Sequence, residues 1–359
     1  MTIQMLFQLM VEKQASDLYL RTKAFPRARI DGKIQIIDSE PVSKEEMSAI
    51  VHMLLANDER RHALKENLDI DFIHEEPKVG RFRISIFTQR GTHALVARHV
   101  HTHVRTFEEL SLPADLCKMF CEESKGLFLL CGPAGNGKST TVASMLEYIN
   151  VRESKHIITI EDPIEFLFTD KKSIINQREL YLDVTSFPAA LKHVTQQSPD
   201  IIYIGNIRDE DTMKAAITAT ELGTFVMSTF HTINAVQTIM RIVNFFPPHL
   251  HEEVRIQLSM ILRGTISLRL LPRKDGRGRI PAYETMVVTP TIARLIREGK
   301  VEGIQEYIDK GDLFGMQSFR QSLVKLVKAD LVDVDEARNL ADSKDEFDLA
   351  MKGIKSQFD

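Results

Sequence analysis

The chain has 359 residues, of which 43% are hydrophobic and 27% charged, a composition typical of a globular protein in aqueous solution. Its length exceeds the usual size of one hydrophobic core and predicts two domains, while the formal net charge of −4 argues against nucleic-acid binding over a large surface. Because no apolar stretch is long enough to cross a membrane and no cleavable signal begins the chain, we expect a cytoplasmic protein with only peripheral membrane contact.

Cysteine usage excludes a disulfide-stabilised scaffold. The chain has three cysteines, Cys117, Cys121 and Cys131, too few for a disulfide framework. Cys117 and Cys121 lie four residues apart on one predicted helix face, a spacing that also occurs in metal sites. No neighbouring histidine or cysteine pair completes a ligand set, so we expect buried thiols.

The first hundred residues have the pattern of a small α/β domain. An amphipathic helix opens the chain, and Ser43 followed by Glu46 marks the start of a second helix. The predicted strands cover residues 16–20, 27–34, 68–74, 80–88 and 93–100, and the second helix covers residues 43–66.

Arginines lie in the last two of these strands. Phe82, Ile84 and Ile86 point to one face of the predicted sheet, and Arg83 points to the other. In the following strand Arg98 shares a face with two small apolar residues. These arginines are either solvated or, in an oligomeric nucleoside triphosphatase, placed to stabilise the phosphate charge at the site of a neighbouring copy.

A phosphate-binding sequence follows a predicted buried strand at residues 126–130. The pattern G-x-x-x-x-G-K-[S/T] and the apolar residues after it, at helical spacing, give strand, glycine loop and helix in the order of a P-loop. Lys138 is expected to reach the β- and γ-phosphates of a nucleoside triphosphate, and Ser139 to bind Mg²⁺. The predicted loop consists of Gly132, Pro133, Ala134, Gly135, Asn136, Gly137, Lys138, Ser139 and Thr140.

Carboxylates follow a second apolar strand, at residues 157–160. Glu161 and Asp162 end this strand, and Glu165 comes three residues later. Because the carboxyl ends of parallel strands line the ligand crevice, we expect these side chains beside the phosphates, where Mg²⁺ and a water-activating base are needed.

An amide and an imidazole follow two further apolar strands. Asn206 follows the strand at residues 201–204, and an amide there can hydrogen-bond to water but cannot accept its proton. His231 follows the apolar run at residues 224–230. It is either a structural residue or a sensor of the γ-phosphate.

The last hundred residues combine a strand pair with helices. The predicted strands at residues 266–271 and 280–288 are joined by a basic turn, which is either solvated or in contact with lipid headgroups or nucleic acid. Residues 290–355 have a helical pattern and are expected to form a small bundle that a partner contacts.

Together these segments resemble the secretion ATPase superfamily, and within it the type IV pilus retraction ATPases of the PilT/PilU group. The resemblance covers nearly the whole chain. Its markers are residues 132–141, residues 158–166 (similar to the Asp box), residues 176–179, residues 205–209 (similar to Walker B) and residues 229–232 (similar to the His box). The segments that lean toward PilU are residues 9–13, 243–247 and 315–319.

The resemblance implies an α/β protein with two main domains. The two domains are a PAS-like α+β N-terminal domain (residues 1–103) and a RecA-like P-loop ATPase core (113–289). A linker (104–112) joins them, and a C-terminal helical region (290–359) follows the core. It implies a homohexamer that hydrolyses ATP with Mg²⁺ at the cytoplasmic face of the inner membrane, beneath the pilus platform protein. A paralogous retraction ATPase is a further implied partner, and nucleic acid is not.

The resemblance also assigns roles to single residues. Glu165 matches the Asp-box glutamate that acts as general base, and Arg83 and Arg98 match the arginines that reach the nucleotide. Asn206 and His231 occupy catalytic positions of the family. The metal site is expected to comprise Ser139, Glu161 and Asp162.

Three positions depart from the family pattern. Asn206 replaces the Walker B glutamate, Thr224 stands where many relatives have the first His-box histidine, and residues 291–296 only partly match the retraction motif. The first departure leaves two main hypotheses, an ATP-driven retraction motor and a weakly hydrolytic or non-hydrolytic accessory ring that couples to an active paralogue. A third, a nucleic-acid translocase, is disfavoured by the acidic composition.

Overall fold

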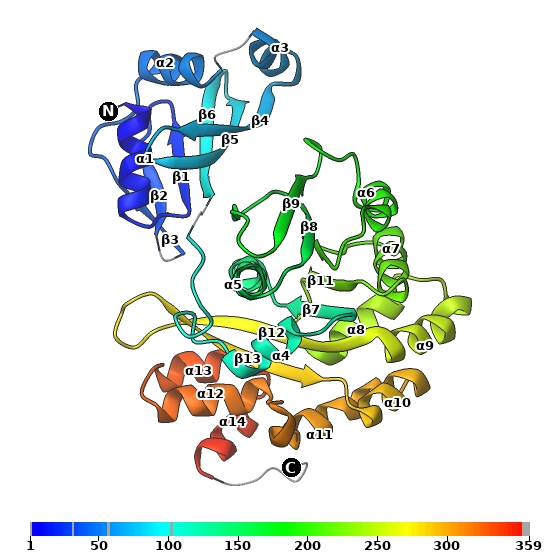
Figure 1. The fold of residues 1–359 in the computed structure, drawn as a ribbon. Coiled ribbons are helices and arrows are strands. Elements are labelled where there is room, and N and C mark those ends of the chain that lie inside the picture. Colours follow the sequence, from blue (N-terminus) through cyan, green and yellow to red (C-terminus); the bar gives the residue numbers. More distant parts are fainter. Residues whose placement is uncertain (1, 31, 56–57, 101–102, 354–359) are drawn as a thin grey trace. The chain divides into compact units, whose positions relative to one another are not determined.

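The computed structural model describes the chain except for residues 1, 31, 56–57, 101–102 and 354–359 (Figure 1). The chain divides into two compact units. The first comprises Met1–His103 together with Glu165–Leu167, and the second comprises Val104–Ile164 together with Phe168–Asp359.

The first unit is built on an antiparallel sheet. Its elements are α1 (Ile3–Glu12), β1 (Asp17–Arg21), β2 (Arg27–Ile30), β3 (Lys33–Ile36), α2 (Lys44–Leu54), α3 (Asp58–Asn67), β4 (Asp69–Glu76), β5 (Gly80–Gln89) and β6 (Thr92–Val100). The six strands pair in the order β3-β2-β1-β6-β5-β4. Phe82, Ile84 and Ile86 of β5 are fully buried on one face, where Phe7 of α1 stacks on Phe82 with ring centroids 4.1 Å apart. The predicted alternation of β5 is confirmed.

The predicted single strand at residues 27–34 is wrong. The chain reverses within it, and β2 and β3 form an antiparallel hairpin instead. Gly32 has φ 81°, a left-handed conformation that glycine adopts without steric cost. The dipeptide Asp31-Gly32 is a hairpin signal that the sequence contained.

The predicted single helix at residues 43–66 is also wrong, because two helices, α2 and α3, occupy this segment. Its predicted start is confirmed. The Glu46 N–H donates to Ser43 Oγ at 3.0 Å, and the Ser43 N–H donates to a Glu46 carboxylate oxygen at 2.8 Å. This capping box satisfies two backbone donors that have no partner inside the helix. Leu55 ends α2 with φ −92° and ψ 62°.

The second unit is built on a seven-stranded sheet. Its strands are β7 (Gly126–Cys131), β8 (His156–Glu161), β9 (Ile174–Glu179), β10 (Ile201–Ile204), β11 (Phe225–Phe230), β12 (Leu262–Pro272) and β13 (Arg279–Val287). They pair in the order β13-β12-β7-β11-β10-β8-β9. All pairs are parallel except the β12–β13 hairpin. The residues of β7, β10 and β11 are all buried, as expected for parallel strands covered on both faces.

Helices cover both faces of this sheet (Figure 1). They are α4 (Ala114–Cys121), α5 (Lys138–Arg152), α6 (Phe187–Val194), α7 (Glu210–Glu221), α8 (Ala235–Val243) and α9 (His251–Ile261). Phe128 and Leu130 of β7 belong to one buried cluster with residues of α4 and α5. Leu127 and Leu129 belong to a second cluster with residues of α6, α7 and α8. The sheet therefore lies between two helical layers.

The C-terminal part is helical, as predicted. It contains α10 (Pro290–Glu298), α11 (Ile304–Asp309), α12 (Phe319–Lys328), α13 (Val334–Leu340) and α14 (Lys344–Met351). Phe319 and Leu323 of α12 pack with Leu271 of β12 and Ala282 of β13 in one buried cluster. The last helices are thereby fixed to the hairpin β12–β13.

Two further expectations concern thiols and the membrane. Cys117, Cys121 and Cys131 are free and buried, which confirms the prediction of buried thiols. Burial raises the pKa of Cys117 to about 12. Within the described residues, no helix combines the length and the apolar character that a membrane span requires.

Candidate nucleotide-binding site

The predicted P-loop connects the carboxyl end of β7 to the first turn of α5. Gly132, Gly135 and Gly137 have φ values of 141°, 77° and 85°, which other residues rarely adopt. A Cβ atom on Gly132 would lie 2.6 Å from the carbonyl oxygen of Leu268 in β12. The turn therefore favours glycine at all three positions, and the close approach of β12 also requires it at Gly132.

Lys138 is the first residue of α5 and is 7% exposed. Its ammonium group donates to the carbonyl oxygens of Gly132 at 2.6 Å and of Pro133 at 3.0 Å. The side chain is therefore folded back over the loop, where an ammonium group and the helix N-terminus both favour a bound phosphate.

The tip of the loop is held by the β12–β13 hairpin. The Asn136 side-chain oxygen accepts a hydrogen bond from the Leu270 N–H at 2.8 Å. The Arg279 guanidinium donates to the carbonyl oxygen of Gly135 at 3.2 Å. The sequence assigned no role to Arg279. A contact between segments more than a hundred residues apart leaves no local pattern.

Strand order brings three more predicted residues to the edge of the sheet that carries the P-loop. β11 pairs with β7, β10 with β11, and β8 with β10, so their carboxyl ends form one row. His231 follows β11, Asn206 lies just beyond β10, and Glu161 ends β8. At the usual strand spacing, the end of β8 lies about 14 Å from that of β7. Asn206 and His231 therefore lie between Glu161 and the P-loop strand.

Glu161 is fixed by two side chains. It is 8% exposed, accepts from the Thr159 hydroxyl at 2.6 Å and from the Gln177 amide at 3.3 Å. Asp162 is more exposed and lies 3.9 Å from the Arg208 guanidinium. Both carboxylates can supply oxygens to a cation that phosphate oxygens also bind.

Asn206 is buried at the end of β10, with 7% of its surface exposed. Its side-chain oxygen has no hydrogen-bond partner in the part of the chain that the structure describes. A buried acceptor without a partner is costly, and such groups commonly bind water or an ion. This acceptor can therefore orient a water molecule at the strand end.

His231 lies in a positive environment. Partial burial and the nearby charges of Lys138, Arg208 and Arg241 lower its pKa. The imidazole is therefore neutral at physiological pH and can both donate and accept a hydrogen bond. Arg208, to which the sequence assigned no role, is a further member of the site, because it lies near Asp162 and its charge acts on His231.

Thr224 lies away from this row. It immediately precedes β11, and its carbonyl oxygen accepts a hydrogen bond from the N–H of Gly126 at the start of β7. Thr224 therefore lies at the amino edge of the parallel strands, opposite to the P-loop. This departure from the family pattern does not alter the phosphate end of the sheet.

The two predicted arginines lie together on the first unit. Arg83 of β5 and Arg98 of β6 are directly opposite residues of the antiparallel pair, so they share one face of that sheet. Arg98 donates to Asp17 at 2.9 Å, and Asp17 also lies 3.4 Å from Arg29. Arg83 lies 3.4 Å from Asp71. The face that bears them is the one without the buried apolar residues of β5.

Glu165 lies in the connection between β8 and β9, within the short segment grouped with the first unit. The structure thus places the P-loop, Glu161, Asp162, Asn206 and His231 on the second unit. It places Arg83, Arg98 and Glu165 on the first. In the described residues, no group of three or more His, Cys, Asp or Glu side chains is arranged to hold a metal ion by itself.

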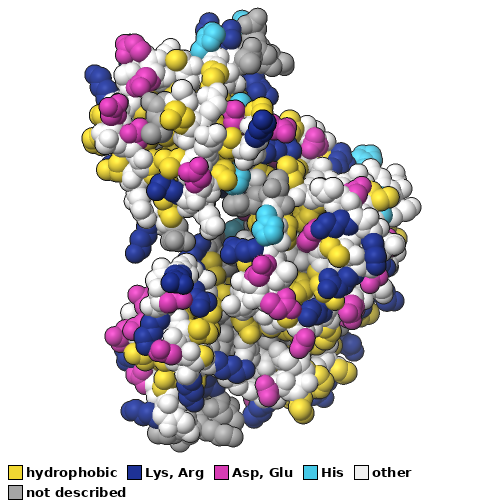
Figure 2. Space-filling view, turned by 60° about the vertical axis from the view of Figure 1, so that its left-hand side comes forward, with side chains coloured by type: hydrophobic (Ala, Val, Ile, Leu, Met, Phe, Trp, Pro, Cys, Tyr) yellow, Lys and Arg dark blue, Asp and Glu magenta, His cyan; other side chains and the backbone are white. Residues whose placement is uncertain are grey.

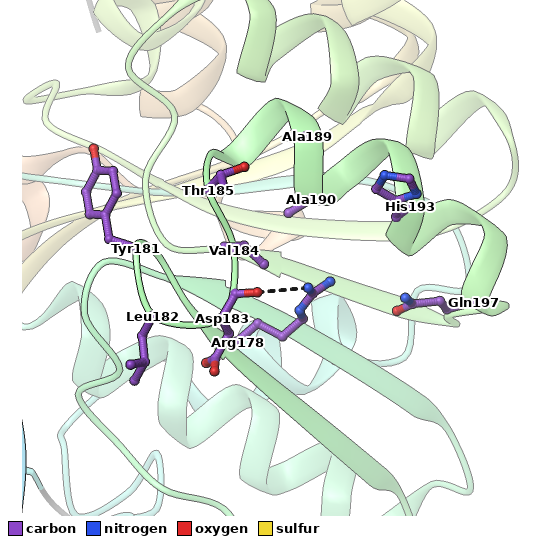
Figure 3. A pocket seen from close by; sticks show the side chains of 10 residues that line it. All are labelled: Arg178, Tyr181, Leu182, Asp183, Val184, Thr185, Ala189, Ala190, His193 and Gln197. Atoms are coloured by element: carbon purple, nitrogen blue, oxygen red, sulfur yellow. Dashed lines mark hydrogen bonds between the residues drawn. The ribbon is translucent and has the colours of Figure 1, made fainter.

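A separate hollow of about 670 Å³ lies beside the end of β9 (Figure 3). It is lined by residues from β9, from α6 and from the loop between them, and by Gln197 in the turn after α6. The Arg178 guanidinium donates to the Asp183 carbonyl oxygen at 3.1 Å. Tyr181 and Leu182 on this loop are 82% and 66% exposed. None of the predicted site residues lines it.

The surface carries charges of both signs. The chain has 46 lysines and arginines against 50 aspartates and glutamates. On the face shown in Figure 2, basic and acidic side chains are interspersed with hydrophobic ones.

Comparison with known proteins shows which family the chain resembles. The family model described as "Type II/IV secretion system protein" matches residues 1–338. The chain is 39% identical over 347 residues to the type IV pilus retraction ATPase PilT of Pseudomonas aeruginosa, covering 97% of this chain and 100% of that protein. It is 36% identical over 360 residues to the type IV pilus ATPase PilU of the same organism, covering 100% and 94%.

The fold agrees with the same group. A crystal structure of the pilus retraction motor PilT with bound ADP superposes with a TM-score of 0.86 at 40% sequence identity, covering 96% of this chain and 98% of that one. The P-loop, the row of polar residues beside it and these similarities lead to one assignment. The chain belongs to the Type II/IV secretion system protein family of ATPases.

Proposed function

We propose that this protein is a Mg²⁺-dependent ATPase that acts as a homohexameric motor of type IV pilus retraction. The observation that carries the proposal is the P-loop with its ammonium group, beside a row of polar strand ends on one sheet edge. The relatives named as pilus retraction ATPases support the motor role, and the PilT structure with bound ADP supports the nucleotide.

In the proposed mechanism, backbone N–H groups of residues 135–140 and the Lys138 ammonium bind the β- and γ-phosphates. The Ser139 hydroxyl, with Glu161 and Asp162, would hold Mg²⁺ together with phosphate oxygens. The absence of a protein-only metal cluster among the described residues fits this arrangement, since Mg²⁺ usually keeps phosphate and water ligands. Bound there, the ion would neutralise charge that develops on the transferred phosphoryl group.

The remaining predicted residues act on the attacking water. Glu165 would serve as the general base, Asn206 would orient the water through its unpartnered oxygen, and neutral His231 would contact the γ-phosphate. Arg83 and Arg98 of a second copy would stabilise the transition-state charge in trans. Each site is then complete only between two subunits, which is why we propose a ring.

The proposed location is the cytoplasmic face of the inner membrane. There the ring would act on the pilus platform protein and beside a paralogous retraction ATPase. Peripheral association would suffice for this placement.

A second candidate function rests on Asn206. An amide cannot accept a proton from water, so the chain could be a weakly hydrolytic ring that binds ATP and couples to an active paralogue. Turnover by the purified chain without any paralogue separates the two candidates. Turnover on the order of 1 s⁻¹ or more favours the motor.

Steady-state ATPase assays of two variants test the proposal. Lys138→Ala should abolish nucleotide binding and turnover. Glu165→Gln should retain ADP binding but lose turnover by a factor on the order of 10²–10⁴. Lys155→Ala, which changes a lysine at the start of β8 on the opposite edge of the sheet, is the control. Unchanged turnover in Lys138→Ala or Glu165→Gln would reject the proposed site.

A further inference from the structure

Glu284 of β13 is a buried carboxyl group that the mechanism above does not use. Only 2% of its surface is exposed. It lies directly opposite Ser267 of β12 in the antiparallel pair. One of its oxygens accepts a hydrogen bond from the Ala235 N–H at 2.8 Å.

Ala235 is the first residue of α8, and the short segment 231–234 joins it to the end of β11. Backbone N–H groups in the first turn of a helix have no partner inside the helix, and a carboxylate stabilises them through its hydrogen bond and its charge. Glu284 therefore fixes the point at which the chain leaves His231 and enters α8.

The same turn is fixed on its other side by Thr238. The Thr238 hydroxyl donates to the Asn234 carbonyl oxygen at 2.7 Å and lies 2.6 Å from the Thr232 hydroxyl. It also lies 3.2 Å from the sulfur of Cys131, the residue before Gly132 of the P-loop. The segment after His231 is thus connected to the base of the P-loop by Thr238 and to β13 by Glu284.

Charged residues of β12 and of the C-terminal helical part act on the Glu284 carboxyl group. Burial raises its pKa to about 7, the Ala235 N–H and Arg269 act in the opposite direction, and Asp342 and Asp309 add to the rise. Arg269 of β12 itself lies 2.7 Å from Asp342 and donates to the Leu340 carbonyl oxygen at 2.9 Å. Glu284 therefore lies between α8 and the C-terminal helices. The Cys131 thiol is a further titratable neighbour.

We propose that Glu284 is a positioning residue for ATP hydrolysis, which sets the His231 segment relative to the P-loop by holding the first turn of α8. This inference rests on the proposed role of His231 at the γ-phosphate. It connects β13 directly to the phosphate end of the site, and the C-terminal helices indirectly, through the charge of Arg269.

The test compares Glu284→Ala and Glu284→Gln with Ser267→Ala. Ser267 is the matched control because it is buried opposite Glu284 and its hydroxyl has no partner in the described residues. The measurements are kcat and KM for ATP, oligomer size, and hydrogen exchange of the segment 230–238. Glu284→Ala should lower kcat about tenfold, leave KM within about twofold and speed exchange in that segment alone.

Glu284→Gln keeps an acceptor but loses the charge, so it should fall between wild type and Glu284→Ala. Its kcat deficit should be larger at pH 8, where the wild-type carboxyl is ionised, than at pH 6, where it is protonated. If Glu284→Ala does not fold, this pH dependence decides the question.

The proposal is overturned if both variants behave like Ser267→Ala, or if exchange rises equally in β10 and β11, which would indicate general destabilisation. Failure of the proposed function gives a different result. In that case the wild-type ring does not turn over ATP, while local exchange in the segment 230–238 still reports on the Glu284 contact.

Discussion

At the end of β10, an amide occupies a position whose chemistry calls for a carboxylate. Asn206 is buried, and its oxygen has no partner in the described residues, so it can orient water but cannot take a proton. The lone acceptor was not predictable from sequence, because an unpartnered atom is defined by what the folded chain places around it. The position of the amide at the end of a buried strand was predictable, because an apolar run comes before it in the sequence.

Substitution of this amide gives the first prediction. Asn206→Glu should raise ATP turnover about tenfold, because a second carboxylate would assist Glu165 in activating the water. Steady-state ATPase assays measure the gain, with Asn206→Gln as the control that lengthens the amide without adding charge. A rise from undetectable turnover to full activity would instead favour the accessory ring.

Glu284 gives a prediction about stability and pH. Burial raises its pKa in the folded protein from 4.5 to about 7, so between these values the folded state holds more protons than the unfolded state. Stability contributed by this group is complete below pH 4.5 and is lost as the pH rises through 7. Glu284→Gln lacks the ionisation, so its Tm should rise relative to wild type from pH 5 to pH 8.

The relative shift should reach at most about 5 °C and should level off above pH 8. Thermal unfolding of both proteins across this pH range measures it. Ser267→Ala should show no pH-dependent difference from wild type. A constant difference between Glu284→Gln and wild type would show that the carboxyl ionises normally in the folded chain.

Among the elements, the β12–β13 hairpin makes contacts with the P-loop that its sequence did not predict. The hairpin itself was predicted, and its pairing is confirmed, but the sequence left open whether the turn is solvated or binds lipid or nucleic acid. The structure shows Arg279 at the P-loop and Asn136 bound to Leu270. Both contacts depend on β12 lying beside β7, which only the folded sheet reveals.

Removal of the Arg279 contact should loosen the P-loop. Arg279→Ala removes an exposed hydrogen bond to the Gly135 carbonyl oxygen, so the ADP dissociation constant should rise about threefold. Calorimetric titration with ADP and Mg²⁺ measures the change. Arg277→Ala, which removes a neighbouring arginine from the same turn, should bind ADP like wild type. Equal weakening in both would assign the effect to general charge instead.

Secondary structure was predictable where the hydrophobic pattern was strong. The buried strands of the second unit follow from continuous apolar runs, and α2 begins where its capping box predicts. Two predicted elements were wrong because the residue pattern of a strand or a helix continued across the point where the backbone changes direction. The strand at residues 27–34 turns at Gly32, and the helix at residues 43–66 divides into α2 and α3.

For the whole molecule, the proposed site residues are divided between two units. The P-loop and the polar strand ends belong to the second unit, and Arg83 and Arg98 belong to the first. Arg98 is paired with the buried Asp17 and Arg83 with the exposed Asp71, so each arginine has an acidic partner on its own unit before any nucleotide is bound. The sequence identified these residues, but only the strand register shows that they are direct neighbours.

Mixed rings test most directly whether a second copy completes the site. Lys138→Ala removes the P-loop ammonium, and the double variant Arg83→Ala/Arg98→Ala removes the arginines. Each ring alone should be inactive, whereas an equimolar mixture should recover about a quarter of wild-type ATPase activity, because about a quarter of its interfaces join two intact halves.

Arg27→Ala, on β2 of the same sheet, is the control and should be active alone. Subunit exchange in the mixture is verified by native mass spectrometry. Recovery of ATPase activity in rings that contain both variants is the result we predict. Fully mixed rings that remain inactive, or full activity of the double arginine variant alone, would contradict the account.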